Sequence, residues 1–365
     1  MMLRLLADDL TGALDSAAEF TGLCGPIKVV WPDGAIAQLE GSLTIDSGTR
    51  ELDQAQAFAK VEKLAPMLRG ASIAFKKIDS LLRGPWVAEL AACLQTGDWD
   101  ACLVAPAFPH QGRRTRDGRQ YARASDDRWH AVGPDIVQQF GAQDIAAQLG
   151  RIAEPLSSGV TVFDAESDED LLRIAEIGRR YAGRVLWCGS GGLASALAAG
   201  SEIKTSRKIT APVLGVFGSD HAATAAQIAR CSDVTVPLRS DSRIDVDAIK
   251  RRLAAGLALV KLDAPAGSAR AQAARHFAAE LAVLAREIDR PATLIISGGE
   301  TLKAQCLATG AQTLKVIGRP EPGVPRSVIE DGAWQGVEVV SKSGAFGPPD
   351  LWWKLLSENA LIEGK

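Results

Sequence analysis

The sequence lacks an excess of positive charge, a long apolar run and closely paired cysteines. A formal net charge of −3 argues against a general nucleic-acid binder, which would carry a basic face. No apolar run approaches the roughly 18 residues of a membrane span, and two aspartates come too early for a secretory signal. We therefore expect a cytoplasmic protein without nucleic-acid or membrane partners. The six scattered cysteines indicate buried reduced thiols, and the four histidines show no metal-binding spacing.

Two common nucleotide-binding motifs are also missing. The sequence contains no G-x-x-x-x-G-K-[ST] loop and no complete G-x-G-x-x-G followed by an acidic residue about 20 positions later. A P-loop protein and a dinucleotide dehydrogenase are thus both disfavoured. The turn Gly189–Gly192 (Gly-Ser-Gly-Gly) approaches the hydrolase elbow G-x-S-x-G, but cysteine precedes Ser190 by two positions. Without a convincing Asp/His series downstream, a hydrolase triad is disfavoured too.

A repeated unit is present instead: a short apolar strand, a turn bearing Gly or Asp, and an Ala/Leu-rich helix. This alternation predicts an α/β protein with mainly parallel sheets flanked by helices. A length of 365 residues suggests two domains, which we expect to be Rossmann-like. The polar segment 201–212 ends in Pro212 before a new strand. We therefore place the domains at 1–205 and 210–365.

Two other segments have a distinct composition. Segment 106–128 is rich in Pro, Gly and charge and lacks apolar periodicity, so it predicts a long functional or mobile loop. Its Arg113 and Arg114 could close over a ligand, or they could form an ordinary solvated charge run. Segment 268–288 has helical apolar spacing, and Ser268 is its expected cap.

The first strand ends in an acidic turn, where Asp8 and Asp9 precede Thr11 and Gly12 at a helix start. Two adjacent carboxylates can accept a hydroxyl proton or orient Mg²⁺, while free amides at the helix start can hold an anion. These four residues are candidates for a catalytic site. The alternative is structural: Asp9 caps the helix and Asp8 is solvated.

Two cationic turns follow other apolar stretches of the N-terminal half. One contains Lys77, Asp79 and Arg83, and the other contains Asp46 and Arg50. Arginine can bind a carboxylate with two parallel hydrogen bonds, and lysine adds a point charge. Each turn alone could be solvated. Three polar turns in one domain favour a pocket for a small anionic molecule.

The C-terminal half carries glycine-bearing turns after its predicted strands. Glycine lets a backbone approach phosphate closely, and Ser or Thr adds a hydroxyl. Glycines at strand–helix corners are often only structural, so no single turn is decisive. The candidate nucleotide-binding residues are Ser219, Gly298, Gly299, Glu300, Thr301 and Gly344.

These motifs together resemble the four-carbon acid sugar kinase family, in order and over nearly the whole chain. The likeness lies in ADDLTGALDSA, KKIDSLLRGP, PAFPHQGRRTRDG and VFDAESDEDL, then in WCGSGGLASAL, GVFGSDHAATAAQI, SGGETLKA, PGVP and KSGAFG. It implies an N-terminal domain that binds a sugar acid and a C-terminal domain that binds ATP. Residue by residue, it implies substrate contacts from Asp8, Asp9, Thr11, Lys77, Asp79 and Arg83, and ATP contacts from Ser219, Gly298 to Thr301 and Gly344.

The chain departs from the family at three places. Leu81 stands where threonine is common, Ala345 replaces a glycine or asparagine, and the turn from Asp46 to Arg50 is altered. These departures concern the choice of acid more than the reaction.

The expected reaction is in-line transfer of the ATP γ-phosphoryl to a terminal hydroxyl of the acid, with Mg²⁺ neutralising charge. Asp8 or Asp9 would be the base, and Arg83 with Lys77 would clamp the carboxylate. Domain closure would exclude water. The residues that would hold the metal are not assigned, and a homodimer is the default expectation. The alternatives are an NAD(P)-dependent hydroxy-acid dehydrogenase and a non-catalytic sugar-acid sensor.

Overall fold

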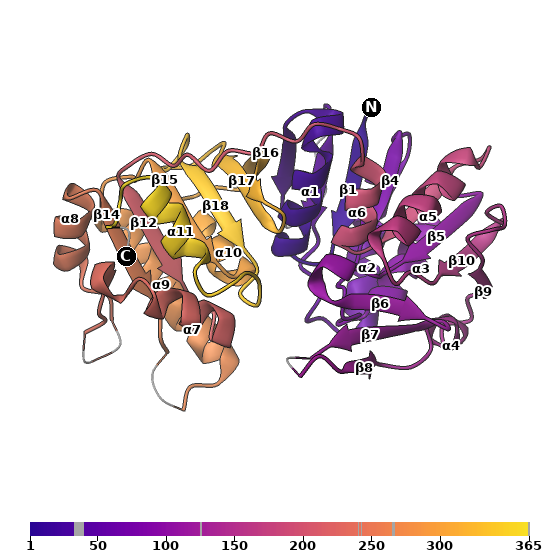
Figure 1. Cartoon of the computed structure of the whole chain (residues 1–365), viewed down its shortest axis with the longest axis horizontal. Coiled ribbons are helices and arrows are strands. Elements are labelled where there is room, and N and C mark those ends of the chain that lie inside the picture. The colour runs from indigo at the N-terminus through magenta and orange to yellow at the C-terminus, as the bar shows by residue number, and fades with distance from the viewer. Residues whose placement is uncertain (33–39, 125, 240, 242, 265–266, 364–365) are drawn as a thin grey trace. The chain divides into compact units, whose positions relative to one another are not determined.

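The computed structural model describes residues 1–32, 40–124, 126–239, 241, 243–264 and 267–363. The chain forms two compact units, Met1–Ile203 and Lys204–Lys365. Figure 1 labels their helices and strands. No helix among the described residues is both long enough and apolar enough to span a membrane.

The first unit is built on a parallel sheet whose strand order is β2-β3-β1-β4-β11-β5-β10-β9. Every neighbouring pair in this order is parallel. All five residues of β4 and of β5 are buried, as expected where helices cover both faces of a sheet. The strands are β1 (Leu3–Ala7), β2 (Ile27–Val30), β3 (Leu43–Asp46), β4 (Ile73–Lys77), β5 (Ala101–Ala105), β9 (Ala147–Gly150), β10 (Gly159–Phe163) and β11 (Val185–Gly189).

Two groups of helices cover this sheet. α1 (Leu10–Cys24) and α5 (Asp168–Arg180) both pack against α6 (Gly191–Ala198), while α2 (Gln54–Leu64) packs against α3 (Trp86–Thr96). Successive side chains of β4 alternate between the groups: Phe75 stacks edge-on against Phe20 of α1, and Ala74 joins the core of α2 and α3. The 3-10 turn η1 (Ala65–Leu68) and helix α4 (Ile136–Gly141) complete that second core.

Segment 106–128 is not the structureless loop that its composition predicts. After the short turn η2 (Pro109–Gln111), β6 (Arg113–Arg116), β7 (Arg119–Arg123) and β8 (Trp129–Val132) form an antiparallel sheet in the order β6-β7-β8. Asp117 and Gly118 join β6 to β7 and have φ of +50° and +69°. A two-residue Asp-Gly connection with both φ values positive is a favoured hairpin turn. This dipeptide, rather than apolar alternation, is the local signal for the strands.

The second unit has a parallel sheet in the order β13-β14-β12-β15-β18, which β17 and β16 extend in antiparallel fashion. Helix α7 packs against α11, and α9 packs against α10. The strands are β12 (Val213–Phe217), β13 (Thr235–Val236), β14 (Leu257–Lys261), β15 (Thr293–Ser297), β16 (Thr313–Glu321), β17 (Val324–Ile329) and β18 (Glu338–Lys342). The helices are α7 (Ala222–Ala229), η3 (Ser232–Val234), α8 (Val246–Ala254), α9 (Arg270–Glu287), α10 (Gly299–Ala308) and α11 (Leu351–Glu358).

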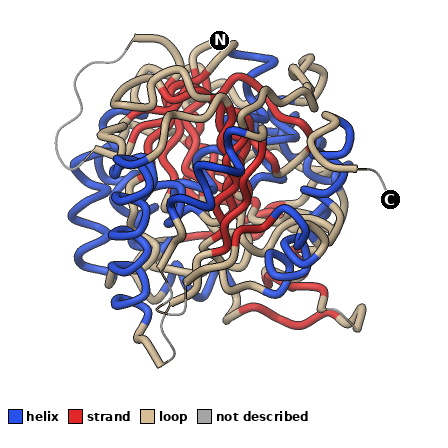
Figure 2. Tube along the Cα trace, turned by 90° about the vertical axis from the view of Figure 1, so that its left-hand side faces the viewer, coloured by secondary structure: helices blue, strands red, loops and turns tan. Residues whose placement is uncertain are grey.

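The sequence-based prediction of mainly parallel sheets flanked by helices is confirmed in outline, and Figure 2 shows strands lying between helices. Five of the six cysteines are buried, as predicted, and burial raises the pKa of Cys93 to about 12. One local detail is wrong. The N-cap position of α9 is Ala269, one residue after the expected Ser268, and Ala269 makes no side-chain cap bond.

Candidate active site

Three polar turns of the first unit follow the neighbouring strands β3, β1 and β4. Ala7 at the end of β1 pairs with Asp46 of β3 on one side and with Lys77 of β4 on the other. The chain leaves β1 for β2 and β3, then returns across β1 to β4. Ligands of such sheets bind where the strand order reverses, at the carboxyl ends of the strands. The register therefore gathers all three predicted turns at one such point.

The acidic turn is held by its own helix. Asp9 has extended backbone angles (φ −147°, ψ 161°) and caps α1, because its Oδ1 accepts a 2.8 Å hydrogen bond from Gly12 N. A Cβ on Gly12 would lie 2.8 Å from that oxygen and 2.9 Å from Lys77 Nζ, so a larger residue here would displace both side-chain ends. The capping alternative is thus confirmed for Asp9. The solvated alternative is wrong for Asp8, which is 1% exposed.

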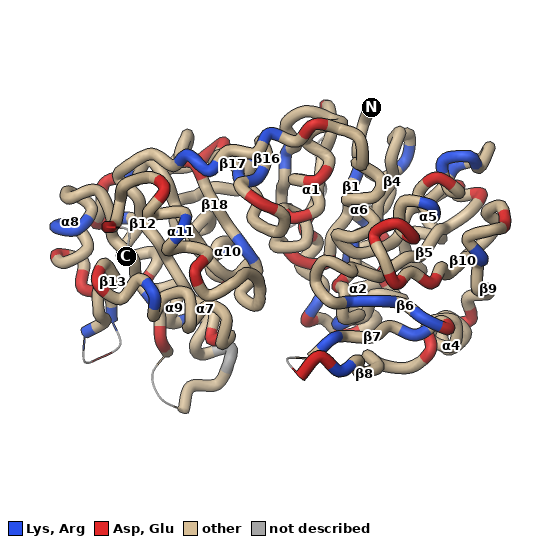
Figure 3. The backbone as a smooth tube through the Cα atoms, in the orientation of Figure 1, with Lys and Arg blue, Asp and Glu red and all other residues tan. Residues whose placement is uncertain are grey.

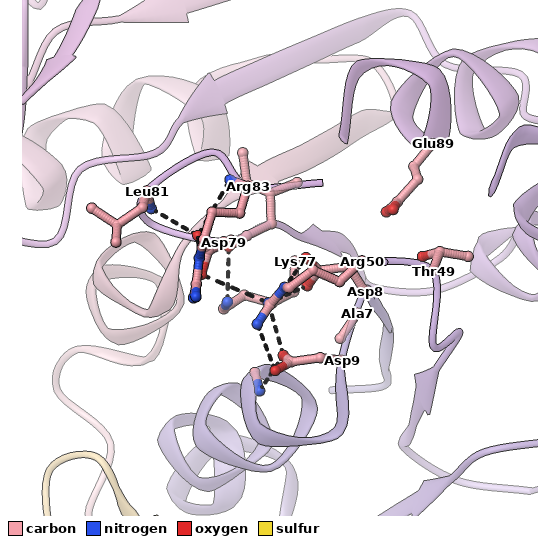
Figure 4. Close-up of polar contacts among 12 residues, drawn as sticks. Ala7, Asp8, Asp9, Thr49, Arg50, Lys77, Asp79, Leu81, Arg83 and Glu89 are labelled. Carbon is pink, nitrogen blue, oxygen red and sulfur yellow. Dashed lines mark hydrogen bonds and ion pairs between the residues drawn. The ribbon is translucent and has the colours of Figure 1, made fainter. Parts of the chain in front are cut away.

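Arg50 bridges both carboxylates of the acidic turn (Figure 4). Its Nε and Nη2 donate to the two oxygens of Asp8, each at 2.8 Å. Its Nη1 donates to Asp9 Oδ2 at 2.6 Å, and its Nη2 also donates to Asp9 Oδ1 at 2.8 Å. One guanidinium therefore fixes two adjacent carboxylates with four charge-assisted hydrogen bonds, which are stronger than neutral ones.

The two carboxylates of the acidic turn nevertheless differ in their ionisation. Burial opposes ionisation of Asp8, but Arg50, together with Lys76 and Lys77, holds its pKa below the ordinary value. Burial and the neighbouring Asp8 charge raise the pKa of Asp9 to about 6, although Arg50 acts in the opposite direction. Two titratable groups with divergent pKa values are a feature of acid–base sites.

Asp79 organises the turn after β4. Its carboxylate accepts from Arg83 Nε and Nη2, both at 2.7 Å, and its Oδ2 also accepts from the backbone N–H of Leu81 and Arg83. Burial opposes ionisation, but Arg83, Arg50 and Lys77 hold the pKa of Asp79 well below its usual range. Asp79 Oδ1 lies 3.8 Å from Arg50 Nη2, so the turn after β4 joins Asp8, Asp9 and Arg50 in one group of charges, the acidic cluster.

The backbone of this turn approaches Arg50 closely. Gly84 has φ +79°, and a Cβ there would lie 2.8 Å from the Arg50 carbonyl oxygen. Leu82 also has a positive φ, +54°, which is uncommon for a non-glycine residue. Such outliers concentrate at functional sites.

A buried ion pair lies under the cluster and was not predicted from the sequence. Lys76 and Glu89 are 0% and 1% exposed, and Lys76 Nζ lies 2.6 Å from Glu89 Oε2. Lys77 Nζ instead donates to the Ile78 carbonyl oxygen at 2.8 Å. Glu89 belongs to the first turn of α3, four residues after the KKIDSLLRGP motif ends, and only the folded structure reveals that Lys76 is its partner.

The two remaining substrate candidates have more local surroundings. Asp46 is 3% exposed, and its Oδ1 accepts from Gly48 N at 2.7 Å, which shapes the turn that carries Arg50. Thr11 is half-buried in the first turn of α1.

In the second unit, the glycine-bearing turns follow β12, β15 and β18, which are neighbours in the sheet. Phe217 pairs with Ser297, and Ser297 pairs with Lys342, so the three turns begin at one level. A Cβ on Gly344 would lie 2.1 Å from Ser219 Oγ, and one on Gly218 would lie 2.4 Å from Thr301 Oγ1. The register thus brings together the turns that carry Ser219, Gly298–Thr301 and Gly344. Gly299, Glu300 and Thr301 form the first turn of α10, and Glu300 is exposed.

A buried lysine supports these turns and was also missed. Lys342 is 1% exposed; its Nζ donates to the carbonyl oxygen of Ser343 at 2.9 Å and to Thr224 Oγ1 at 3.3 Å. Thr224 in turn donates to the Gly344 carbonyl oxygen at 2.8 Å. The lysine in the KSGAFG motif is the signal that could have singled out this residue.

The hydrolase-like turn has a structural explanation. Ser190 is fully buried, donates to the Ala107 carbonyl oxygen at 2.7 Å and accepts from Gly192 N at 3.2 Å. A Cβ on Gly192 would lie 2.5 Å from the same Ala107 oxygen. The hydroxyl and the glycine therefore hold segment 106–108 against the sheet.

Comparison with known proteins identifies both halves of the chain. A sugar-binding N-terminal domain matches residues 3–135 and 122–197, and a nucleotide-binding C-terminal domain matches residues 249–351. A D-threonate kinase from Bordetella bronchiseptica is 30% identical, with 95% of each chain covered. The chain belongs to the four-carbon acid sugar kinase family.

Two further relatives extend the comparison. A 3-oxo-tetronate kinase from Pseudomonas savastanoi pv. phaseolicola is 27% identical, covering 98% of this chain and 97% of the relative. A solved structure of a Haemophilus influenzae protein matches with a TM-score of 0.72 at 18% identity, covering 98% of this chain and all of that one. The structural likeness supports the fold, and the two kinases act on different four-carbon acids.

Proposed function

We propose that this protein is an ATP-dependent kinase that phosphorylates a terminal hydroxyl of a small, four-carbon sugar acid. The observation that carries the proposal is the Asp8–Asp9–Arg50 cluster, which lies at the carboxyl ends of β1 and its neighbours in the sugar-binding domain. The family's relatives include kinases for D-threonate and 3-oxo-tetronate, so either acid, or a stereoisomer, is a candidate substrate.

We assign the role of general base to Asp9. Its side chain is 22% exposed, whereas that of Asp8 is 1% exposed, so Asp9 is the carboxylate that a substrate hydroxyl can reach. A carboxylate with a pKa of about 6 is ionised at neutral pH, yet it accepts a proton more readily than an ordinary aspartate. Asp8 stays ionised and holds Arg50, so its role is to orient the pair.

The nucleotide would bind in the second unit. Glycine at 344 and 218 lets these turns pack against the hydroxyls of Ser219 and Thr301, and glycine-bearing turns allow phosphate to approach the backbone closely. Ser219 and Thr301 would add hydroxyl donors. Lys342 holds the Gly344 turn through Thr224, and we propose that it keeps this phosphate-binding turn in place.

Magnesium fits this arrangement as a companion of the nucleotide. The described part of the chain offers no group of three or more His, Cys, Asp or Glu side chains that could hold a metal. Mg²⁺ commonly keeps several waters and binds through substrate phosphates with only one or two carboxylates. When bound, it would neutralise charge on the transferring phosphoryl group.

The alternatives are a nicotinamide-dependent dehydrogenase and a non-catalytic sensor. The absence of the dinucleotide fingerprint from the sequence argues against the first. Glycine turns gathered in a nucleotide-binding domain argue against the second, because a pure sensor needs no phosphate cradle.

A coupled ADP-release assay tests the proposal. The panel contains D-threonate, 3-oxo-tetronate and other four-carbon acids with Mg²⁺–ATP, and parallel wells contain NAD⁺ or NADP⁺ without ATP. We expect one ADP for each acid phosphorylated, and a roughly 10²- to 10⁴-fold loss of kcat in Asp9→Asn. Asp168→Asn, an exposed position on α5, is the control and should keep wild-type turnover. Acid-dependent NAD⁺ or NADP⁺ reduction without ADP release would favour the dehydrogenase instead.

A further inference from the structure

One arginine of the small β6-β7-β8 sheet, Arg113, is partly buried and lies within electrostatic range of Asp79 and Arg83 of the candidate site. Side chains alternate along a strand, so Arg113 and Thr115 share one face of β6, while Arg114 and Arg116 share the other. Thr115 pairs with Gln120 in the register, and its Oγ1 donates to Gln120 Oε1 at 2.7 Å. Both Thr115 and Gln120 are fully buried. Arg113 therefore lies on the covered face of the sheet.

Gln120 fastens that face to the turn that carries Asp79 and Arg83. Its Nε2 donates to the carbonyl oxygen of Ser80 at 2.8 Å and to that of Pro106 at 3.3 Å. Thr115 also exchanges two backbone hydrogen bonds with Ala165, at 2.9 and 3.0 Å. The small sheet is thus fixed to the residue that follows Asp79.

The Arg113 guanidinium is only partly satisfied. Its Nη1 donates to the carbonyl oxygens of Gln111 and Gly112, at 2.8 and 3.0 Å. Its Nε is buried and has no hydrogen-bond partner among the described residues. Burial lowers the pKa of Arg113, and the nearby charges of Asp79 and Arg83 act on it in opposite directions. A buried donor without a partner is costly, and a ligand carboxylate would satisfy it.

The other arginines of this sheet have partners or face outward. Arg114 lies 4.2 Å from the centre of the Trp129 ring and donates to Glu166 at 2.8 Å. Arg116 is 57% exposed. Figure 3 shows the basic residues along β6 and β7. The Nε of Arg114 is also buried without a hydrogen-bond partner, but Glu166 and the Trp129 ring already engage its guanidinium. Of these three arginines, Arg113 is the one that forms no ion pair with a described residue.

We propose that Arg113 binds the carboxylate of the sugar acid beside Arg83, and that Gln120 positions it. This inference rests on the proposed kinase function. Asp79 already engages Arg83 through two hydrogen bonds, so Arg83 alone offers an anion little uncompensated charge. A second guanidinium supplies that charge and a planar fork that suits a carboxylate.

The test compares a four-carbon sugar acid with the matching uncharged tetritol as phosphoryl acceptors. In Arg113→Gln we expect the KM for the acid to rise roughly 10- to 100-fold, because the variant loses a charge-assisted hydrogen bond to the carboxylate. The tetritol has no carboxylate, so its kcat/KM should change by less than about threefold. Arg113→Lys keeps the charge and should lose less. Gln120→Leu should raise the KM for the acid with little change in kcat. Arg116→Gln, on the outer face, should match the wild type.

Each result bears on the inference. An unchanged KM for the acid in Arg113→Gln overturns it, and so does an equal loss with acid and tetritol, which would indicate a structural role. If Arg113→Gln fails to fold, Arg113→Lys is compared with the wild type instead, and again a loss with the acid that exceeds the loss with the tetritol supports the inference.

Calorimetric binding of the acid separates this inference from the proposed function. If the wild type binds the acid and Arg113→Gln binds it more weakly, but no ADP forms, the kinase proposal fails and the binding site stands. If the wild type neither binds nor phosphorylates any acid of the panel, both fail.

Discussion

The fall in kcat/KM at low pH, the acid limb of the pH–rate profile, should follow the titration of Asp9. Its pKa of about 6 means that the carboxylate is about 90% ionised at pH 7 and about 10% ionised at pH 5. If Asp9 is the base, kcat/KM for the acid should fall about tenfold between these two pH values. An ordinary aspartate, with a pKa near 3.8, would be almost fully ionised at both and would give a nearly flat profile.

Two variants should move this limb in opposite directions. Asp8 raises the pKa of Asp9, so Asp8→Asn should shift the limb to lower pH. Arg50 lowers the pKa of Asp9, so Arg50→Gln should shift the limb to higher pH. Arg50→Gln also leaves the buried carboxylate of Asp8 and the partly buried carboxylate of Asp9 without their partner. Breaking a buried ion pair costs roughly 3–5 kcal/mol of folding stability, so this variant should be assayed well below its melting temperature.

The assay is initial-rate ADP release at saturating Mg²⁺–ATP over pH 5 to 9. Phosphate groups titrate near pH 6 as well, so the Asp9→Asn profile is recorded under identical conditions as the control. That variant should lose the limb along with most of its turnover. A wild-type profile that is flat from pH 7 to 5, or a limb that survives in Asp9→Asn, would refute the assignment of Asp9 as the base.

Three further changes follow from local geometry. Gly84→Ala should lower the melting temperature more than Gly70→Ala, as measured by differential scanning calorimetry. Both residues have a positive φ, but of the two only a Cβ at Gly84 would clash with the Arg50 backbone. Gly344→Ala should raise the KM for ATP at least roughly tenfold, because the added Cβ would clash with Ser219 Oγ. The affinity for the acid, measured by calorimetry, should not change. Adding Ser219→Gly removes the clash and should restore part of the affinity for ATP. Because the pKa of Asp79 is depressed in the folded protein, its carboxylate stabilises the fold at pH values above its ordinary pKa of 3.8. This stabilisation is lost as the pH falls toward the pKa of Asp79 in the folded protein. Urea unfolding of wild type and Asp79→Asn should therefore differ at pH 7 and converge as pH falls below about 4.

Much of the site could be predicted because its polar residues follow apolar strands. The turns at Asp8, Asp46 and Lys77 are each readable from a strand followed by Gly, Asp or basic residues. Parallel strands place their carboxyl ends on one edge of a sheet, so the turns had to lie on the same side. The same reasoning applies to Gly218, Ser297 and Lys342 in the second half.

The contacts between turns could not be read in this way. Arg50 was a candidate for substrate binding, yet its four hydrogen bonds to Asp8 and Asp9 depend on the pairing of β1 with β3. The Lys76–Glu89 pair joins β4 to the helix that follows the KKIDSLLRGP motif, but nothing in that motif marks Glu89 as the partner of Lys76. Strand β6 lacks apolar alternation because arginines stand on both of its faces, so the Asp-Gly turn was the local sign of the hairpin.

With Arg113 set apart as the proposed partner of the substrate carboxylate, the charges around the acidic turn balance before any substrate arrives. Four carboxylates lie among four cations: Asp8, Asp9, Asp79 and Glu89, with Arg50, Lys76, Lys77 and Arg83. A sugar acid adds one negative charge to this set, and a like charge raises the pKa of a neighbouring carboxylate. Because kcat reports the substrate complex and kcat/KM the free enzyme, the acid limb of kcat should lie at higher pH. A kcat limb at lower pH would contradict this reasoning, since it would mean that cations gathered around the bound acid outweigh its own charge at Asp9.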